Sequence, residues 1–226
     1  MKAKLLLFDI DGTILLTGGA GAKAMLATGQ KLFGDSFNFD LDTSGKLDTQ
    51  IYKELSKLNA HLDMGHRHDE FRETYLKFLE FELAWENKAF LMPGIKVLLE
   101  DLRKRQDITL GLLTGNYGPA AKLKLKAVDI QHHWFTITAF GDEGVTRPDL
   151  VELAMKRYKA LIDETLQPRE VVVIGDTPKD VACAQAHGCV AFAVATGRWS
   201  VKQLQAARAD IVVDNLGDAS RLLELL

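Results

Sequence analysis

The 226-residue sequence lacks several features that would assign it to a specialised class of protein. Only two cysteines occur, Cys183 and Cys189, where a helical pattern runs into a strand-like segment, and this predicts buried thiols rather than a disulfide or a metal site. Positive charge is not in excess, because 28 Lys and Arg stand against 31 Asp and Glu. We therefore expect no binding to nucleic acid.

Long apolar runs are also absent. No segment reaches the roughly 18 apolar residues that indicate a membrane-spanning helix, so we expect no membrane association. The chain starts with basic residues, but the apolar run behind them meets Asp9 within five residues and shows no signal-cleavage pattern. A cytoplasmic protein is therefore expected. The length allows one large domain, or a core domain with a smaller insert.

Over most of its length the sequence alternates apolar runs with helical patterns. Strand-like runs occupy residues 5–8, 108–113, 171–174 and 190–194, with further candidates at 135–139 and 211–213. Apolar residues recur every three or four positions at 95–105, 120–128, 149–161 and 179–187. Such alternation indicates βαβ units. The predicted fold class is α/β, with a Rossmann-like parallel sheet flanked by helices.

The segment from residue 16 to residue 90 differs from the rest, because it has no buried-strand run and mixes charge with Leu, Phe, Tyr and Trp. Helical spacing is clearest at 46–58 and 70–85, where Phe71, Tyr75 and Phe78 form a stripe that predicts helix packing. We expect an all-helical cap domain at 16–90, inserted into an α/β core of residues 1–15 and 91–226. Residues 18–21 and 91–94 are the expected hinges.

The most informative motif follows the first strand-like run, where Asp9 and Asp11 stand two residues apart and Gly12 comes next. Ligands of open α/β sheets bind at the carboxyl ends of the strands. Two acids this close repel each other, so the pair implies either a shared proton or a metal ion. An Asp-Gly pair after a strand is also a common turn, and the motif taken alone does not decide between a functional pair of acids and an ordinary turn.

Three other positions beside strand-like runs carry polar groups suited to a phosphoryl group and its metal. They are Thr114, Gly115 and Asn116 after 108–113, Arg147 before the helical pattern at 149–161, and Asp176 with Asp180 after 171–174. A hydroxyl and open backbone N–H groups bind anion oxygens, and an arginine hydrogen-bonds phosphate. Carboxylates suit a hard metal ion. Asp180 could also be an ordinary acid in the first turn of a helix.

These four motifs, in this order, resemble those of the haloacid dehalogenase superfamily, in particular its phosphatases with a helical cap inserted after the first motif. The resemblance covers nearly the whole chain. Gly45 and Lys46 are similar to the cap loop that touches substrate in phosphoglycolate-phosphatase-like members, although Lys46 could also be a solvated lysine. Arg147 departs from the family pattern, in which lysine is commoner, and its planar fork differs from a point-charge ammonium.

The resemblance implies a Mg²⁺-dependent phosphatase that acts on a small phosphorylated metabolite. Asp9 would be the nucleophile that forms an aspartyl-phosphate, and Asp11 would be the general acid and base. Asp9, the main-chain carbonyl of Asp11, and Asp176 would hold Mg²⁺. The other implied roles are phosphate binding by Thr114, Gly115, Asn116 and Arg147, orientation of the metal ligands or of Arg147 by Asp180, and substrate contact by Gly45 and Lys46.

Two alternatives to the phosphatase remain open from the sequence. A phosphomutase of the same family would return the phosphoryl group to a sugar, and a regulatory protein would keep the phospho-acceptor site without turnover. His61, His66 and His68 lie in a polar segment whose spacing favours a surface loop over a metal site. The expected oligomeric state is a monomer or a homodimer.

Overall fold

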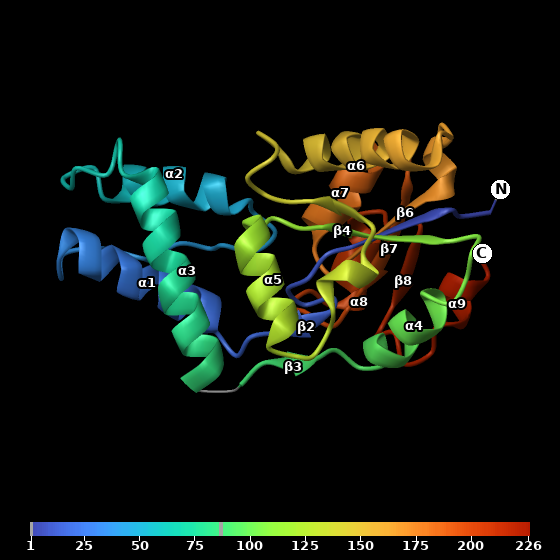
Figure 1. The fold of residues 1–226 in the computed structure, drawn as a ribbon, viewed down its shortest axis with the longest axis horizontal. Coiled ribbons are helices and arrows are strands. Elements are labelled where there is room, and N and C mark those ends of the chain that lie inside the picture. Colours follow the sequence, from blue (N-terminus) through green and yellow to red (C-terminus); the bar gives the residue numbers. More distant parts are fainter. Residues whose placement is uncertain (1, 86–87) are drawn as a thin grey trace.

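The computed structural model describes residues 2–85 and 88–226, and its architecture is the predicted parallel sheet between two helical layers (Figure 1). Six parallel strands lie in the order β5-β4-β1-β6-β7-β8. Their bounds are Leu5–Phe8 for β1, Thr109–Leu113 for β4, Ile137–Ala139 for β5, Val171–Gly175 for β6, Val190–Val194 for β7 and Ile211–Val213 for β8. All six candidate runs are therefore strands of one sheet.

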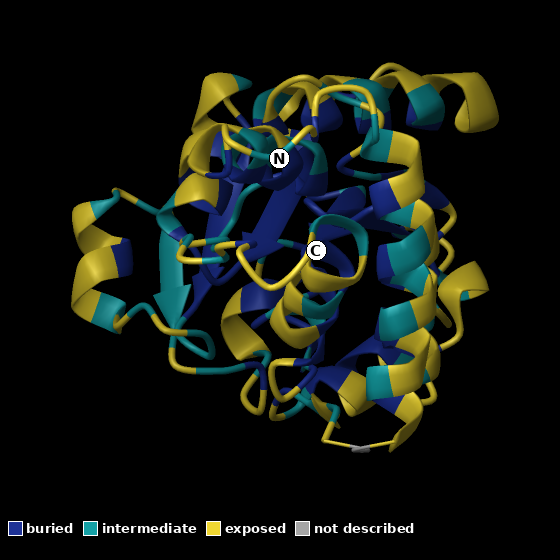
Figure 2. Ribbon diagram, turned by 90° about the vertical axis from the view of Figure 1, so that its left-hand side faces the viewer, coloured by how far each residue is buried: buried dark blue, intermediate teal, exposed yellow. Residues whose placement is uncertain are grey.

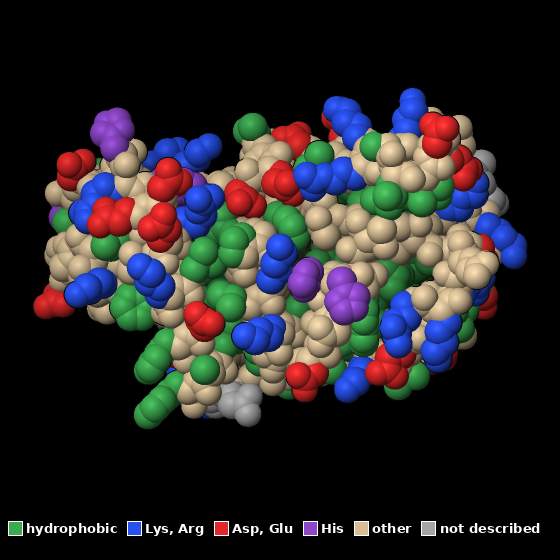
Figure 3. Space-filling view, in the orientation of Figure 1, with side chains coloured by type: hydrophobic (Ala, Val, Ile, Leu, Met, Phe, Trp, Pro, Cys, Tyr) green, Lys and Arg blue, Asp and Glu red, His purple; other side chains and the backbone are tan. Residues whose placement is uncertain are grey.

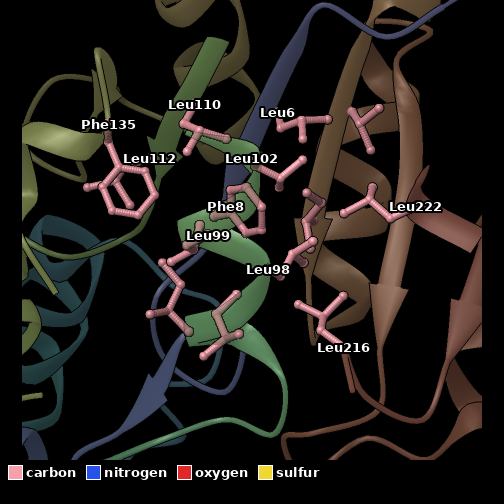
Figure 4. Close-up of a cluster of buried hydrophobic side chains, with 14 of the residues drawn as sticks. Leu6, Phe8, Leu98, Leu99, Leu102, Leu110, Leu112, Phe135, Leu216 and Leu222 are labelled. Carbon is pink, nitrogen blue, oxygen red and sulfur yellow. The ribbon is translucent and has the colours of Figure 1, made fainter. Parts of the chain in front are cut away.

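The helices of the core cover both faces of this sheet. They are α4 (Ile95–Leu102), α5 (Gly118–Lys126), α6 (Arg147–Ile162), α7 (Pro178–Ala186), α8 (Val201–Ala206) and α9 (Ser220–Leu223). Side chains of β1 alternate between the faces, because successive residues of a strand point to opposite sides. Leu6 and Phe8 pack with α4 and α9 in one cluster, which Figure 4 shows, and Leu5 and Leu7 pack with α6 and α7 in the other.

Burial in Figure 2 follows this layering: the strands β1, β6 and β7 are buried, the edge strand β8 is half-buried, and the outer sides of the helices are exposed. Cys183 and Cys189 are free and buried in the α6–α7 layer, as predicted. No helix within residues 2–85 and 88–226 combines the length and apolar character that crossing a membrane requires.

The cap region contains the expected helices but is not entirely helical. Its helices are α1 (Ala20–Phe33), α2 (Asp48–Leu58) and α3 (His68–Trp85). Two short strands, β2 (Leu15–Leu16) and β3 (Phe90–Leu91), pair antiparallel where the chain leaves and re-enters the core. Runs of two residues carry no readable periodicity, which is why the sequence did not reveal them. Residues 86 and 87, inside the expected cap, lie outside the described part of the chain.

The aromatic stripe of α3 packs inside the cap, as predicted for Phe71, Tyr75 and Phe78. The same cluster includes Tyr117 and Ala120 of the loop and helix α5, so a helix that belongs to the core by sequence also packs against the cap. The C-terminal end of α3 differs, because Phe81 and Trp85 stack on each other and are 55% and 78% exposed. Figure 3 shows apolar side chains standing out from the surface at that end of the cap.

Candidate active site

The predicted site residues, except Asp180, line one cavity of about 280 Å³ at the carboxyl ends of β1, β4 and β6. The core lines it with residues of all four motifs, and the cap lines it from the start of α1, the loop before α2, and α3. Parallel strands end at the same edge of a sheet, so loops that are distant in the sequence become neighbours there. Its lining residues include Asp9, Asp11, Gly45, Lys46, Asp48, Tyr75, Thr114, Gly115, Asn116, Lys124, Arg147, Asp176 and Arg198.

Asp9 directly follows β1 and is almost fully buried. Its Oδ2 lies 3.0 Å from a terminal nitrogen of Arg147, whereas its Oδ1 has no hydrogen-bond partner in residues 2–85 and 88–226. Burial raises the pKa of Asp9 to about 6, although the nearby Arg147 acts in the opposite direction. One oxygen of the carboxyl group is therefore held in place while the other remains available.

Asp176 directly follows β6 and is also buried with an unpartnered oxygen, Oδ1, among the described residues. Burial, followed by the carboxylates of Asp180 and Asp9, raises its pKa to about 9. Two glycines make room for this group: a Cβ on Gly12 would lie 2.4 Å from Oδ2, and a Cβ on Gly197 would lie 1.7 Å from it. A carboxyl group packed so closely without partners is costly unless a cation joins it.

Oxygens of Asp9, Asp176 and Asp180 lie within 4.8 Å of one another, close enough to share one metal ion. Asp180 already uses both of its oxygens, one on Arg147 and the other on the N–H and hydroxyl of Thr177. The free oxygens are those of Asp9 and Asp176. An all-oxygen donor set with two free carboxylate oxygens suits a hard cation such as Mg²⁺. The residues therefore fit the expected metal.

Arg147 begins α6 and is buried between Asp9 and Asp180, with its Nε unpartnered among the described residues. Thr114 is fully buried at the end of β4, and its hydroxyl accepts a 2.8 Å hydrogen bond from the Asn116 amide. Gly115 must be a glycine here, because a Cβ would lie 2.1 Å from the carbonyl oxygen of Lys46. The predicted phosphate-binding residues thus face the same cavity as Asp9.

Asp11 points to a different set of partners. Its two oxygens lie 2.8 and 2.7 Å from Nζ of Lys124, and Oδ2 also accepts a 2.7 Å hydrogen bond from the Asn116 amide. The Asp11 side chain is 39% exposed, whereas that of Lys124 is only 6% exposed. The Asp11 carboxylate is not in the group formed by Asp9 and Asp176, so any contact of this residue with a metal is left to its main chain.

Sequence reasoning missed Lys124, and it assigned no role to Asp48, the last residue of the cap-loop motif that begins at Gly45. Lys124 lies in the buried stripe of α5 with Ala120, Ala121 and Leu125, and a lysine at an apolar position of a helix is the signal that could have revealed it. Asp48 begins α2 and forms hydrogen bonds with two residues of the loop after β4. Its N–H donates to the Gly115 carbonyl at 2.7 Å, and its Oδ2 accepts from the N–H of Tyr117 at 2.8 Å. Burial raises the pKa of Asp48 to about 7.

The two cap residues predicted to touch substrate lie in the turn before α2, and Lys46 is not part of that helix. Gly45 has a positive φ of 60° and packs against Thr177 and Lys179. Lys46 forms an ion pair with Glu54 while lining the cavity. The cap loop also contacts the core through Lys179, which donates to the Ser44 carbonyl at 2.8 Å, and through Arg198.

The histidines of the cap form no metal site in the described part of the chain. His61 and His66 are exposed in turns, as expected. His68 is not in the loop: it begins α3, is half-buried, and lies 2.8 Å from the hydroxyl of Tyr117. Burial lowers its pKa. This contact joins the cap to the loop that leads into α5.

Comparison with known proteins identifies the family of the chain. The profile of the haloacid dehalogenase-like hydrolases matches residues 3–188. A phosphoglycolate phosphatase of Photorhabdus laumondii is 27% identical over 222 residues, covering 93% of this chain and 88% of that protein. The pyrophosphatase PpaX of Bacillus cereus is 24% identical over 237 residues, covering 99% and 97%.

A solved structure of a hydrolase from Pseudomonas syringae has the same fold, with a TM-score of 0.73, 21% identity, and coverage of 99% of this chain and 98% of that one. The family match covers most of the chain, including all four motif loops. The curated relatives are named as phosphatases and pyrophosphatases. The chain therefore belongs to the haloacid dehalogenase-like hydrolases and is an enzyme that groups with their phosphatases.

Proposed function

We propose that this enzyme is a Mg²⁺-dependent phosphatase that hydrolyses a small phosphomonoester through an aspartyl-phosphate on Asp9. The observation that carries the proposal is the pair of buried, unpartnered oxygens of Asp9 and Asp176 in the cavity that Arg147 and Thr114 also line. This arrangement combines a nucleophile, a cation site and anion-binding groups.

Asp9, the main-chain carbonyl of Asp11, and Asp176 are the proposed ligands of Mg²⁺. A bound Mg²⁺ supplies positive charge that offsets the negative charge on the phosphoryl oxygens during transfer. Arg147 contributes a second positive charge, and Asp180 holds it in place through a hydrogen bond to the guanidinium. Thr114, Gly115 and Asn116 provide the hydroxyl and N–H donors around the phosphoryl group.

In the first step, an oxygen of Asp9 attacks phosphorus, and the bond from phosphorus to the ester oxygen breaks. The departing oxygen takes a proton from Asp11 and leaves as an alcohol. In the second step, water attacks the phosphorus of the aspartyl-phosphate and gives a proton to Asp11. The bond between phosphorus and Asp9 breaks, which releases inorganic phosphate and restores both carboxyl groups.

The size of the cavity and its cover favour a small substrate. The cavity has a volume of about 280 Å³, and the cap loop that carries Gly45 and Lys46 lines one side of it. We propose that these two residues contact the part of the substrate beyond the phosphoryl group. The relatives named for phosphoglycolate and pyrophosphate make small phosphorylated metabolites the first compounds to test.

The division into a core of 1–15 and 91–226 and a cap of 16–90 accords with the two connections at β2 and β3.

The test is phosphate release from a panel of phosphorylated metabolites and from p-nitrophenyl phosphate, with and without Mg²⁺. We expect turnover that requires Mg²⁺ and that falls by at least about 10³-fold in Asp9→Asn, because the nucleophile is lost. Asp101→Asn, at an exposed position, is the matched control. Wild-type turnover in Asp9→Asn would refute the nucleophile. Transfer of phosphate to a sugar instead of water would indicate a phosphomutase, and no turnover of any compound would indicate a regulatory protein.

A further inference from the structure

We propose that Lys124 is a positioning residue that orients the carboxyl group of Asp11 for proton transfer to and from the leaving group. The inference rests on the proposed phosphatase reaction, in which Asp11 acts at the ester oxygen. Lys124 comes from α5, more than a hundred residues after Asp11 in the chain, and lies outside the four motifs.

The contacts around Asp11 restrain its carboxyl group from two sides. Nζ of Lys124 lies 2.8 and 2.7 Å from its two oxygens and 2.6 Å from Oδ1 of Asn116. The amide of Asn116 donates both to Asp11 and to the hydroxyl of Thr114. Rotation of the Asp11 side chain would break all of its contacts with Lys124 and Asn116. The group is therefore held in one orientation before substrate binds.

The burial of Lys124 argues against an incidental ion pair. A lysine ammonium is rarely buried, because removal from water is costly unless each of its donors finds an acceptor. Lys124 is 6% exposed and shares the buried side of α5 with Ala120, Ala121 and Leu125. Its ammonium donates to the carboxylate of Asp11 and to the amide oxygen of Asn116. This ammonium is thus directed entirely at the loop residues that meet the substrate.

Helix α5 packs against the cap as well as in the core. Tyr117, directly before the helix, is buried in the cap cluster, donates its N–H to Asp48, and lies 2.8 Å from His68 through its hydroxyl. Ala120 of the first turn packs in the same cluster. Figure 1 shows α5 lying between α3 of the cap and the strands of the core. Cap packing and the orientation of Asp11 therefore depend on the same helix.

The experiment compares leaving groups. The variant is Lys124→Met, the matched control on the same helix is the exposed Lys122→Met, and the substrates are p-nitrophenyl, phenyl and benzyl phosphate. The p-nitrophenolate ion leaves without protonation, whereas the alkoxide of benzyl alcohol needs a proton. We expect Lys124→Met to lower kcat/KM about 10- to 100-fold for benzyl phosphate and less than about threefold for p-nitrophenyl phosphate. Lys122→Met should leave all three values unchanged.

Two further variants test whether Lys124 acts through Asp11. In an Asp11→Asn background, Lys124→Met should cause no further loss with benzyl phosphate, because the group that it orients is absent. Lys124→Gln retains an NH₂ group that can donate hydrogen bonds, so its kcat/KM for benzyl phosphate should lie between those of wild type and Lys124→Met. This variant tests the same role if the methionine variant does not fold. Inactivity of the wild type on all three esters would instead refute the proposed function.

Three results would overturn the role of Lys124. An equal fall for all three substrates would show a structural or phosphate-binding role. A rise in kcat/KM would show that Lys124 holds Asp11 away from the substrate. An undiminished effect in the Asp11→Asn background would show that Lys124 acts independently of Asp11.

Discussion

Replacing Asp176 with asparagine should stabilise the metal-free protein while abolishing its response to Mg²⁺. Burial and two neighbouring carboxylates raise the pKa of Asp176 from its ordinary 3.8 to about 9. At pH 7 the folded protein therefore keeps a proton on Asp176 that the unfolded chain loses. Because the pKa is raised in the folded state, the folded protein binds more protons than the unfolded chain between about pH 4 and pH 9, and its stability falls as pH rises through this range.

The size of the effect follows from the pH interval. Each unit between the ordinary pKa and pH 7 costs about 1.4 kcal/mol, so holding the proton costs at most about 4 kcal/mol. Asparagine is neutral and similar in shape, and it avoids this cost. Its amide must still find partners in the same space, so we expect a net gain of about 2–3 kcal/mol in the free energy of unfolding. For a chain of this length that raises Tm by about 5–10 °C.

The assay is thermal unfolding at pH 7 in EDTA and in excess Mg²⁺, for wild type, Asp176→Asn and the exposed control Asp101→Asn. Mg²⁺ at 100 times its Kd should stabilise the wild type by about 2.7 kcal/mol and leave Asp176→Asn unchanged. The control should follow the wild type in both buffers. Lower stability of Asp176→Asn than of wild type in EDTA would refute the inference that the buried carboxyl group of Asp176 destabilises the metal-free protein. A remaining increase in Tm with Mg²⁺ would refute the role of Asp176 as a metal ligand.

Two more outcomes are expected from the same site. Gly197→Ala should weaken Mg²⁺ binding at least about tenfold, because its Cβ would lie 1.7 Å from the Asp176 carboxylate. Calorimetric titration measures the Kd of Mg²⁺, and an unchanged Kd would contradict the close packing of Gly197 against Asp176. Asp48→Asn should leave stability near pH 4 unaltered and raise it by about 2–4 kcal/mol at pH 8. Burial raises the pKa of Asp48 to about 7, so between about pH 4 and pH 7 the unfolded chain loses a proton that the folded protein keeps, and the stability of the wild type falls over this range. Unfolding scans across this pH range test the sign, and a loss of stability at pH 8 would refute it.

Much of the core could be predicted because its signals are local. The strand β1 is buried on both faces, so it reads as an unbroken apolar run in the sequence. Asp9 and Asp176 each come directly after a strand, and parallel strands end at one edge of the sheet, so chain order alone implied that these side chains lie together. The short strands β2 and β3, with two residues each, offered no such pattern.

The sequence by itself determined the alternating sheet and helices and the loops that carry the four motifs. The helical spacing of Ala120, Ala121 and Leu125 separates Lys124 from the lysines at 122 and 126, but it does not show what the Lys124 side chain contacts. Only the tertiary structure decided that Lys124 meets Asp11. Tyr117 and Ala120 pack against the cap while Ala121 and Leu125 pack in the core, and this rotation of α5 directs Lys124, one turn after Ala120, toward Asp11. The role of Asp48 depends in the same way on where the cap rests against the core.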